Sequence, residues 1–193
     1  MAGWLTDGVP QLTTTTGLET INIDTNGPNG VNPQTGAVGM QQLTNLISFY
    51  GNGLDKTMVS GSRYYSSINI GFPSVLTGAS VRVGTTGGTD SWILELHSPT
   101  GVLLATTATA GTTAGTASTW QQIAFTATYN LLVPGTYFIA VQSNGTSAKF
   151  DSVNAPTNSG VMTGSATGVF GTGASITPPT TYTANLGPKV LVY

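Results

Sequence analysis

The residues best suited to chemistry in this sequence lie close together, around its single histidine. Glu95 and His97 are two residues apart, so on an extended strand their side chains would point to the same face. Ser98 would point to the opposite face, and no G-x-S-x-G motif is present to hold a serine on a strained turn. A Ser-His-Asp arrangement needs such a nucleophile. We therefore expect His97 to be a hydrogen-bonded surface histidine and not a catalytic base.

The other ionisable residues do not form a recognisable metal or acid–base site. One histidine, no cysteine and seven dispersed acidic residues exclude the usual zinc sites. Asp24, Asp90 or Asp151 could join backbone carbonyls in a calcium site, but no D-x-D-x-D-G loop is present. Asp90 and Glu95 would lie about 17 Å apart along one strand, farther than glycoside hydrolysis requires. We expect no enzyme activity, no metal and no cofactor.

Glycine-rich and aromatic segments predict turns and core residues, with one alternative left open. Gly84–Gly88 matches neither a dinucleotide-binding nor a phosphate-binding loop, so it predicts a hairpin loop. Asn144-Gly145-Thr146 has the form of a glycosylation sequon, yet Asn-Gly favours a tight hairpin turn between Val141 and Phe150. Aromatic residues of strands usually belong to the core. If they reach solvent instead, they would form a glycan-binding platform, with Trp92, Trp120 and Tyr129 as its residues.

Charge is scarce in this chain of 193 residues. Only 6% of the residues are charged, against about 25% in typical soluble proteins. This composition favours a fibre, a shell component or a secreted β domain over a free cytosolic monomer. The formal net charge is −2 and the five basic residues are scattered, so we expect no nucleic-acid partner.

Neither a membrane helix nor a secretion signal is predicted. No apolar run approaches the roughly 20 residues that a membrane helix needs. The first residues lack the basic and apolar regions of a signal peptide. We expect synthesis in a cytoplasm and no membrane partner.

Short alternating segments separated by turn residues fill most of residues 56–193. In 136–142, for example, Tyr137, Ile139 and Val141 share one face, and the segment 92–97 alternates in the same way. Such regular punctuation is typical of antiparallel β-sandwiches and jelly rolls. We predict an all-β protein, with a jelly-roll-like antiparallel β-sandwich domain over 56–193. An extended N-terminal arm and one short helix, within 1–55, would precede it.

Several details of this β domain follow from the same patterns. The first strand is expected to include Tyr64, Tyr65 and the run Ile68–Ile70, and a connection should follow over 72–78. The small, uncharged stretch Ala108–Ser118 predicts an exposed loop. Short strands are expected at Val161–Gly164 and Gly168–Gly171, and a C-terminal strand at Lys189–Tyr193 should be tied into a sheet.

The arm contains one short segment of strand character. Between Gly17 and Thr25, Glu19, Ile21 and Ile23 alternate with polar residues. A single strand is not stable by itself. We therefore expect this segment to pair with another chain or to lie on a partner's surface.

The predicted helix runs from Ala37 to Tyr50, after Pro33 and a cap at Gln34 or Thr35. Its apolar positions have the 3-4-3 spacing of a coiled-coil seam, over about two heptads. Such a helix is too short to be stable alone. It would either pack on its own β domain or form a bundle at the axis of a homotrimer. The seam residues are Met40, Leu43, Ile47 and Tyr50.

Two parts of the sequence resemble structural proteins of tailed bacteriophages. The segment Gly17–Thr25, followed by Gly30–Thr35 and a short helix, is similar to a leader of such proteins. The segments Val83–Trp92, Pro134–Phe138 and Gln142–Gly145 resemble a β domain that phage virion proteins carry. The resemblance covers much of the chain and contains no catalytic motif. It implies a component of the virion.

Within this class, the resemblance implies most directly a capsid decoration (cement) protein. Such proteins commonly form trimers on the shell, with an arm laid on the major capsid protein and a β domain facing outward. The expected location is the capsid exterior, after assembly in the host cytoplasm. The expected capsid-binding residues of the arm are Leu18, Glu19, Ile21, Ile23, Asp24, Asn32, Pro33 and Gln34.

Two alternatives stay open. The chain could be a tail-fibre or adsorption protein that uses the same leader as an anchor and binds a host surface glycan through its β domain. It could also be a stand-alone carbohydrate-binding module. The number of copies per virion separates decoration proteins from adsorption proteins, and glycan binding tests the third class.

Overall fold

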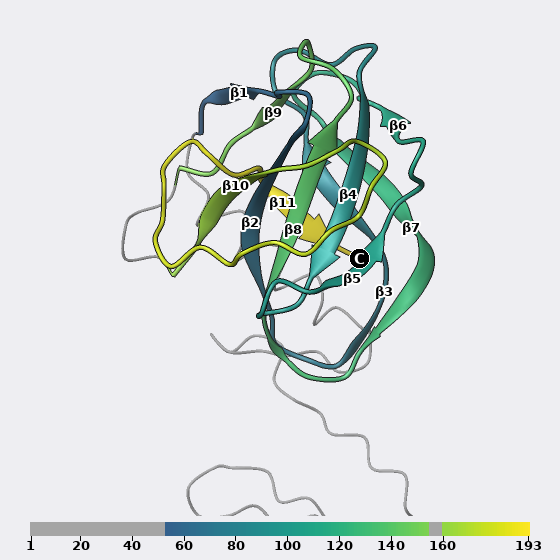
Figure 1. The fold of residues 1–193 in the computed structure, drawn as a ribbon, viewed down its shortest axis with the longest axis vertical. Coiled ribbons are helices and arrows are strands. Elements are labelled where there is room, and N and C mark those ends of the chain that lie inside the picture. The colour runs from purple at the N-terminus through teal and green to yellow at the C-terminus, as the bar shows by residue number, and fades with distance from the viewer. Residues whose placement is uncertain (1–52, 155–159) are drawn as a thin grey trace, which may run out of the picture. The chain divides into compact units, whose positions relative to one another are not determined.

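The structure, a computed structural model, describes residues 53–154 and 160–193. These residues form an all-β fold without a helix, in which every strand pair is antiparallel. The strands are β1 (Asp55–Thr57), β2 (Ser62–Ile70), β3 (Ser74–Arg82), β4 (Ser91–His97), β5 (Leu103–Thr106), β6 (Thr112–Thr113), β7 (Trp120–Leu131), β8 (Gly135–Ser143), β9 (Lys149–Asp151), β10 (Thr163–Thr167) and β11 (Val190–Val192) (Figure 1).

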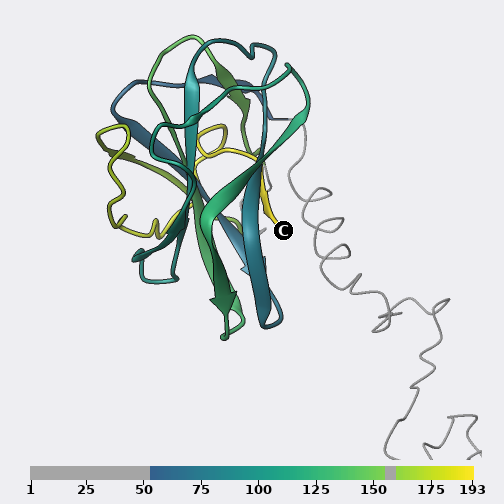
Figure 2. The same ribbon diagram turned by 90° about the vertical axis from the view of Figure 1, so that its right-hand side faces the viewer.

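Two sheets make up most of the fold. The large sheet has the strand order β10-β2-β8-β4-β5, with β6 paired to one end of β4, and the small sheet has the order β11-β3-β7. β1 and β9 form a separate two-stranded pair. The β2–β3 turn and the β7–β8 turn lie at the same end of the domain in both Figure 1 and Figure 2.

The main core lies between these two sheets. Trp92, Leu94 and Leu96 of β4 point into it and are fully buried, and Ala79 and Val81 face them from β3. Burying each leucine side chain contributes about 1.5–3 kcal/mol. The period-two alternation predicted for 92–97 and 136–142 is confirmed, because these segments form β4 and β8 with one face in this core.

The opposite face of the large sheet is also covered. Residues 168–178, here called the covering segment, cross in front of β2, β8 and β4 (Figure 1). Ile176 of this segment packs on Tyr65, Phe138 and Ala140. Its backbone N–H donates to the carbonyl of Gly101, whose φ of +86° favours glycine. The large sheet is therefore buried on both sides.

The predicted hairpin at Asn144-Gly145 is wrong. β8 pairs with β2 and β4, whereas β9, which contains Phe150, pairs with β1. The chain leaves the large sheet at Asn144, and the side-chain oxygen of Asn144 accepts a hydrogen bond from the backbone N–H of Ser91. The turn residues were identified correctly, but they connect two different sheets.

Other sequence predictions were confirmed or corrected in detail. The predicted connection over 72–78 mostly belongs to β3, which begins at Ser74 and contains an irregularity between Leu76 and Gly78. Gly168–Gly171 is a turn and not a strand. The C-terminal strand is confirmed as β11, paired to β3. The loop 108–118 is mostly exposed, although it includes the short strand β6 and the buried Ala114.

We predict that Tyr65 links the stability of the domain to alkaline pH. Its hydroxyl donates to the carbonyl of Thr177, and burial raises the pKa of this phenol above its ordinary value of about 10. Its stabilising contribution is complete below pH 10 and is lost as the pH rises through the folded-state pKa. Tyr65→Phe should lower the free energy of unfolding by about 1 kcal/mol at pH 7.

Urea unfolding of both proteins between pH 7 and 11 measures this link. Above pH 10 the free energy of unfolding should fall less steeply for Tyr65→Phe than for the wild type. Identical slopes in the two proteins would contradict the prediction.

Candidate functional site

The histidine and the glutamate singled out in the sequence belong to a polar cluster on the covered face of the large sheet. This polar cluster consists of Arg63, Glu95, His97 and Gln142. Arg63 Nε donates to Glu95 Oε2 at 3.0 Å, and Gln142 Nε2 donates to Glu95 Oε1 at 2.6 Å. His97 Nε2 lies 3.4 Å from Glu95 Oε2. Glu95 is thus the centre of the cluster.

The register of the strands brings these four side chains together. Arg63 on β2 is opposite Gln142 on β8, and Gln142 is opposite Ile93 on β4, so these residues share a face. Glu95 and His97 follow at steps of two along β4 and point to the same side. The strand alternation therefore places the cluster, although its members are far apart in the sequence.

The covering segment and the adjoining end of β10 complete the cluster with backbone carbonyl groups. The guanidinium of Arg63 donates to the carbonyls of Thr167 and Thr172, and Gln142 also donates to Thr172. Gly173 lies directly above Glu95, since a Cβ added there would lie 3.7 Å from Glu95 Oε1 and 2.5 Å from Leu103 Cδ2. The glycine allows the backbone to approach this closely.

The expectation that His97 is a surface histidine is wrong. His97 and Glu95 are both 0% exposed, and Arg63 is 3% exposed. Neither ring nitrogen of His97 makes a hydrogen bond. The alternation of β4 showed correctly that both side chains leave the main core. It did not show that a second layer, the covering segment, lies over that face.

A cluster closed in this way organises the fold rather than presenting a reactive group. A general acid or base must come within hydrogen-bonding distance of the atom that it serves, and a substrate has no access to Glu95 or His97 while the covering segment is in place. Charges buried at this depth must be paired to be tolerated. The arrangement of Arg63 and Glu95 meets this requirement.

The other acidic candidates have structural partners as well. Asp90 Oδ2 accepts hydrogen bonds from the backbone N–H groups of Ser147 and Ala148, each at 2.7 Å. Asp151 Oδ2 lies 3.1 Å from Arg82 Nε and 2.9 Å from Lys189 Nζ. No group of three acidic or histidine side chains in the described part of the chain could hold a metal ion. Asp24 lies outside the described residues.

Every charged side chain in the described residues contacts another group of the same domain. Asp55 accepts from the backbone N–H of Thr85 and lies 3.8 Å from Lys149 Nζ, and Lys56 lies over the ring of Tyr64. The remaining charged residues are those of the polar cluster and the two aspartates with their partners. The rest of the surface formed by the described residues carries no charged side chain.

The glycan platform predicted from aromatic residues does not form as proposed. Trp92 is 0% exposed and lies in the main core, so it has no free face for a sugar. Trp120 and Tyr129 are only partly buried, but they lie on β7 nine residues apart. Nine residues of extended strand span roughly 30 Å. These two rings cannot stack on one sugar.

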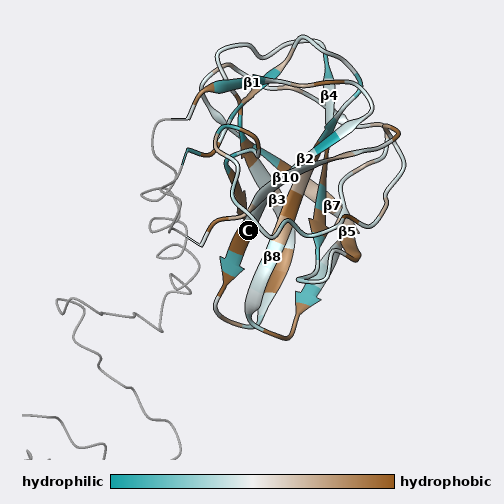
Figure 3. Cartoon of the chain, turned by 60° about the vertical axis from the view of Figure 1, so that its left-hand side comes forward, coloured by the Kyte–Doolittle hydropathy of each residue, from teal (hydrophilic) through white to brown (hydrophobic). Residues whose placement is uncertain are grey.

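Large apolar side chains are exposed at one end of the domain. Phe72 lies in the β2–β3 turn and Val75 at the start of β3, and Leu132 and Val133 belong to the β7–β8 turn. They are 48%, 62%, 77% and 68% exposed, respectively. Ile70 pairs with Gly135 and Ser74 with Leu131, so the two turns are neighbours. We call these four residues the apolar tip, and Figure 3 shows the hydrophobic β7–β8 turn.

The apolar tip has no charged residue in its own segments. No Asp, Glu, Lys or Arg occurs in residues 64–81 or 96–148. Exposed apolar patches commonly mark interaction sites. The sequence contained this signal, since Leu132-Val133-Pro134 and Phe72-Pro73 are apolar residues beside turn formers. The sequence prediction assigned Phe72-Pro73 only to a connection and gave Leu132 and Val133 no role.

The predicted arm and helix residues cannot be compared with the structure. The arm residues between Leu18 and Gln34 and the helix seam Met40, Leu43, Ile47 and Tyr50 lie outside the described residues. The predicted domain boundary at 55/56 lies within β1.

Comparison of the chain with protein families, with curated proteins and with solved structures found no match. Among the described residues, no helix is long and apolar enough to cross a membrane.

We predict that the polar cluster depends on both partners of its ion pair. Glu95→Leu leaves the guanidinium of Arg63 buried without its carboxylate and should lower the free energy of unfolding by about 3–5 kcal/mol. The double variant Arg63→Met/Glu95→Leu should recover most of this loss, since it removes both charges. Urea unfolding measures all three proteins.

Lys149→Ala is the matched control for the ion-pair variants. It breaks the partly exposed pair with Asp55 and should cost no more than about 1 kcal/mol. If Glu95→Leu costs no more than this control, the cluster does not have the role described.

Proposed function

We propose that this chain is a structural virion protein of a tailed bacteriophage, namely a capsid decoration (cement) protein. In this proposal it has no enzymatic activity and no cofactor, and it binds the major capsid protein on the capsid exterior as a homotrimer. Its β domain is a sandwich of the jelly-roll kind. The starting point is the resemblance of segments 17–35 and 83–92 to phage virion proteins.

The observation that best supports a binding role is the apolar tip. The ionisable groups of the domain are paired internally, whereas four large apolar side chains are exposed together on two neighbouring turns. Enzymes usually gather polar groups in an accessible cleft instead. The domain therefore exposes apolar side chains suited to binding another apolar surface, whereas its ionisable groups are already paired.

The partner surface is expected to be uncharged and apolar. Charged partners are attracted by charge complementarity, and the segments of the apolar tip contain no charge. Burial of apolar surface contributes about 25 cal/mol per Å². Leu132 and Val133 would together contribute a few kcal/mol, and three copies in one trimer would strengthen attachment through avidity.

The arm and the helix have separate roles in this proposal. The arm, with Ile21 and Ile23 as its apolar residues, would lie on capsid subunits. The helix seam would join three copies at the trimer axis. The order of events is then trimer formation through the helix and attachment through the arm and the apolar tip.

We predict that the apolar tip is required for binding to the shell. The variant Val75→Thr/Leu132→Ser/Val133→Ser should bind to parent capsids lacking this protein at least tenfold more weakly than the wild type. Sedimentation of capsids with bound protein measures the affinity. In the wild type, the number of bound copies per particle separates decoration of the shell, with hundreds of copies, from attachment to the tail.

The control variant is Val59→Ser/Val169→Ser. Both valines are exposed, at 50% and 70%, and they lie near Gly61 and Gly168, at the other end of β2 from the apolar tip. This variant should bind like the wild type. Equal binding of the tip variant and the wild type would contradict the role of the tip, and no capsid binding by the wild type would contradict the function itself.

We predict that the helix seam holds the trimer together. Light scattering of the purified protein should give three times the monomer mass of 19.7 kDa. Leu43→Asp/Ile47→Asp should give the monomer mass, because charges on a seam prevent its burial. The control Gln42→Asp/Ser48→Asp places the same charges beside the seam and should remain trimeric. A monomeric wild type would contradict the prediction.

A further inference from the structure

Each turn of the apolar tip contains an apolar residue followed by a proline. These pairs are Phe72-Pro73 between β2 and β3 and Val133-Pro134 between β7 and β8. Proline fixes its own φ and lacks an N–H group, and it restricts the residue before it to extended conformations. The two turns therefore have few accessible backbone conformations, and each has one donor fewer to satisfy.

In both turns, a hydroxyl group donates a hydrogen bond to the carbonyl of the residue before the proline. Tyr137 donates to the carbonyl of Val133 at 2.6 Å, and Ser74 donates to the carbonyl of Phe72 at 3.1 Å. A backbone carbonyl that is covered by a partner must have a hydrogen-bond donor. These two carbonyls already have one within the domain.

Tyr137 connects the β7–β8 turn to the main core. Its ring is buried there, with Ile139 and Val141 on the same face of β8. Because interior side chains are closely packed, the ring and its hydroxyl group have a fixed position. Leu132 and Val133 are mostly exposed, so packing of their own side chains contributes little to the conformation of the turn.

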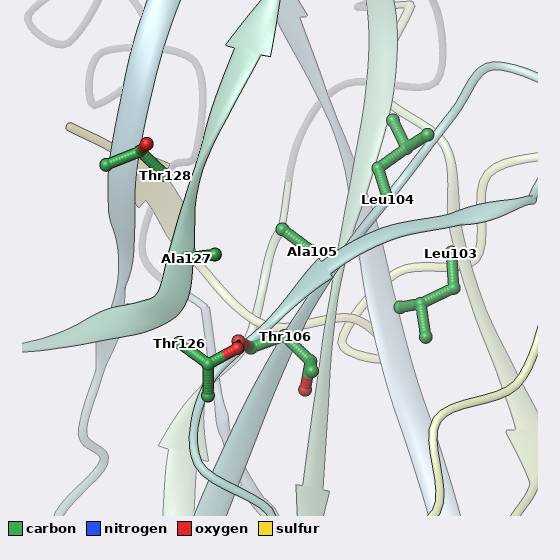
Figure 4. Close-up of a pocket in the computed structure, with 7 residues that line it drawn as sticks. All are labelled: Leu103, Leu104, Ala105, Thr106, Thr126, Ala127 and Thr128. Atoms are coloured by element: carbon green, nitrogen blue, oxygen red, sulfur yellow. The ribbon is translucent and has the colours of Figure 1, made fainter.

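The strand that leads into this turn is interrupted shortly before it. The register of β3 against β7 shifts between Leu76 and Gly78. Residues 125–128 of β7 therefore have only Thr77 opposite them, and just three residue pairs remain between this bulge and the turn. Beside the bulge, between β5 and β7, lies a cavity of about 250 Å³, and Figure 4 shows Ala127 pointing across it. This end of β7 thus has less support than a continuous sheet would give.

We propose that Tyr137 is the positioning residue of the apolar tip, and that its hydroxyl group holds Leu132 and Val133 as a preformed binding surface. Ser74 has the same role for Phe72. For the identity of the partner, this inference rests on the proposed function, in which the tip binds an apolar surface of the major capsid protein. Such a partner has to match the apolar side chains and does not have to supply donors for the two carbonyls.

A preformed surface binds more tightly than a mobile one with the same side chains. Ordering of loops and side chains on association opposes binding. When the turn is already held by Tyr137, this ordering has taken place during folding. Loss of the hydroxyl group should therefore weaken binding although no side chain of the tip is changed.

Backbone order parameters from NMR relaxation of the full-length protein test the preformed turn without any partner. Rigid backbone gives values of about 0.85, and flexible backbone gives values below about 0.6. The amides of Leu132 and Val133 should lie near the rigid value in the wild type. They should fall towards the flexible value in Tyr137→Phe, which keeps the ring but lacks the hydroxyl group. In Ser74→Ala, the same fall is expected at the amide of Phe72.

Tyr65→Phe is the matched control. It removes a hydrogen bond of the same kind, from a tyrosine hydroxyl to the carbonyl of Thr177 at 3.1 Å, on the covered face of the large sheet. The order parameters of Leu132 and Val133 should not change in this variant. Flexible values in the wild type, or equal values in Tyr137→Phe and the wild type, would overturn the proposal.

Binding to parent capsids lacking this protein tests the effect on the partner. Tyr137→Phe should bind about fivefold more weakly than the wild type, which is the effect of one hydrogen bond. Tyr65→Phe should bind like the wild type, whereas a general loss of stability would affect both variants alike. Equal binding by Tyr137→Phe and the wild type would also overturn the proposal. If the wild type itself does not bind capsids, the proposed function fails, and the order parameters still decide whether Tyr137 holds the turn.

Discussion

The burial of the large sheet on both faces is the constraint on which most of this structure depends. A sheet covered on one side can place its polar residues in water on the other. Here the second side carries Arg63, Glu95 and Gln142 under the covering segment, so these groups must satisfy one another. The covering segment supplies the missing acceptors through its carbonyl groups. The buried cluster and the covering segment therefore depend on each other: the segment buries Glu95, and its carbonyl groups satisfy the donors around Glu95.

Ion pairs and hydrogen bonds within the domain also determine how its charged residues are used. The chain has few charged residues, and in the described part they fix segments in place. Asp90 binds the two residues just before β9, and Asp151 joins β3 to the residue before β11. Charges held in this way do not steer a distant partner strongly. In the proposed function, recognition would therefore depend on shape and on apolar contact at the apolar tip.

The limits of the sequence prediction follow from particular residues. The alternation in β4 and β8 identified both strands, because each has one face in the main core. Asn144-Gly145 identified a turn but not the partner of the next strand, since turn residues contain no information about distant pairing. Leu76 and Gly78 read as a connection because a bulge interrupts the alternation there. The burial of Glu95 and His97 could not be predicted, because it depends on a segment more than seventy residues later in the sequence.

The open edges of β5 and β7 and the uncharged surface belong to the same argument about assembly. For a protein that remains alone in solution, an unprotected edge invites pairing with other chains, and a surface with few charges gives little repulsion against it. In the proposed function the protein is fixed to a larger particle, whose surface would cover such edges. The bulge at residues 125–128 also interrupts the free edge of β7, because the middle of this strand leaves the small sheet. An interrupted edge is a poorer template for pairing with another chain.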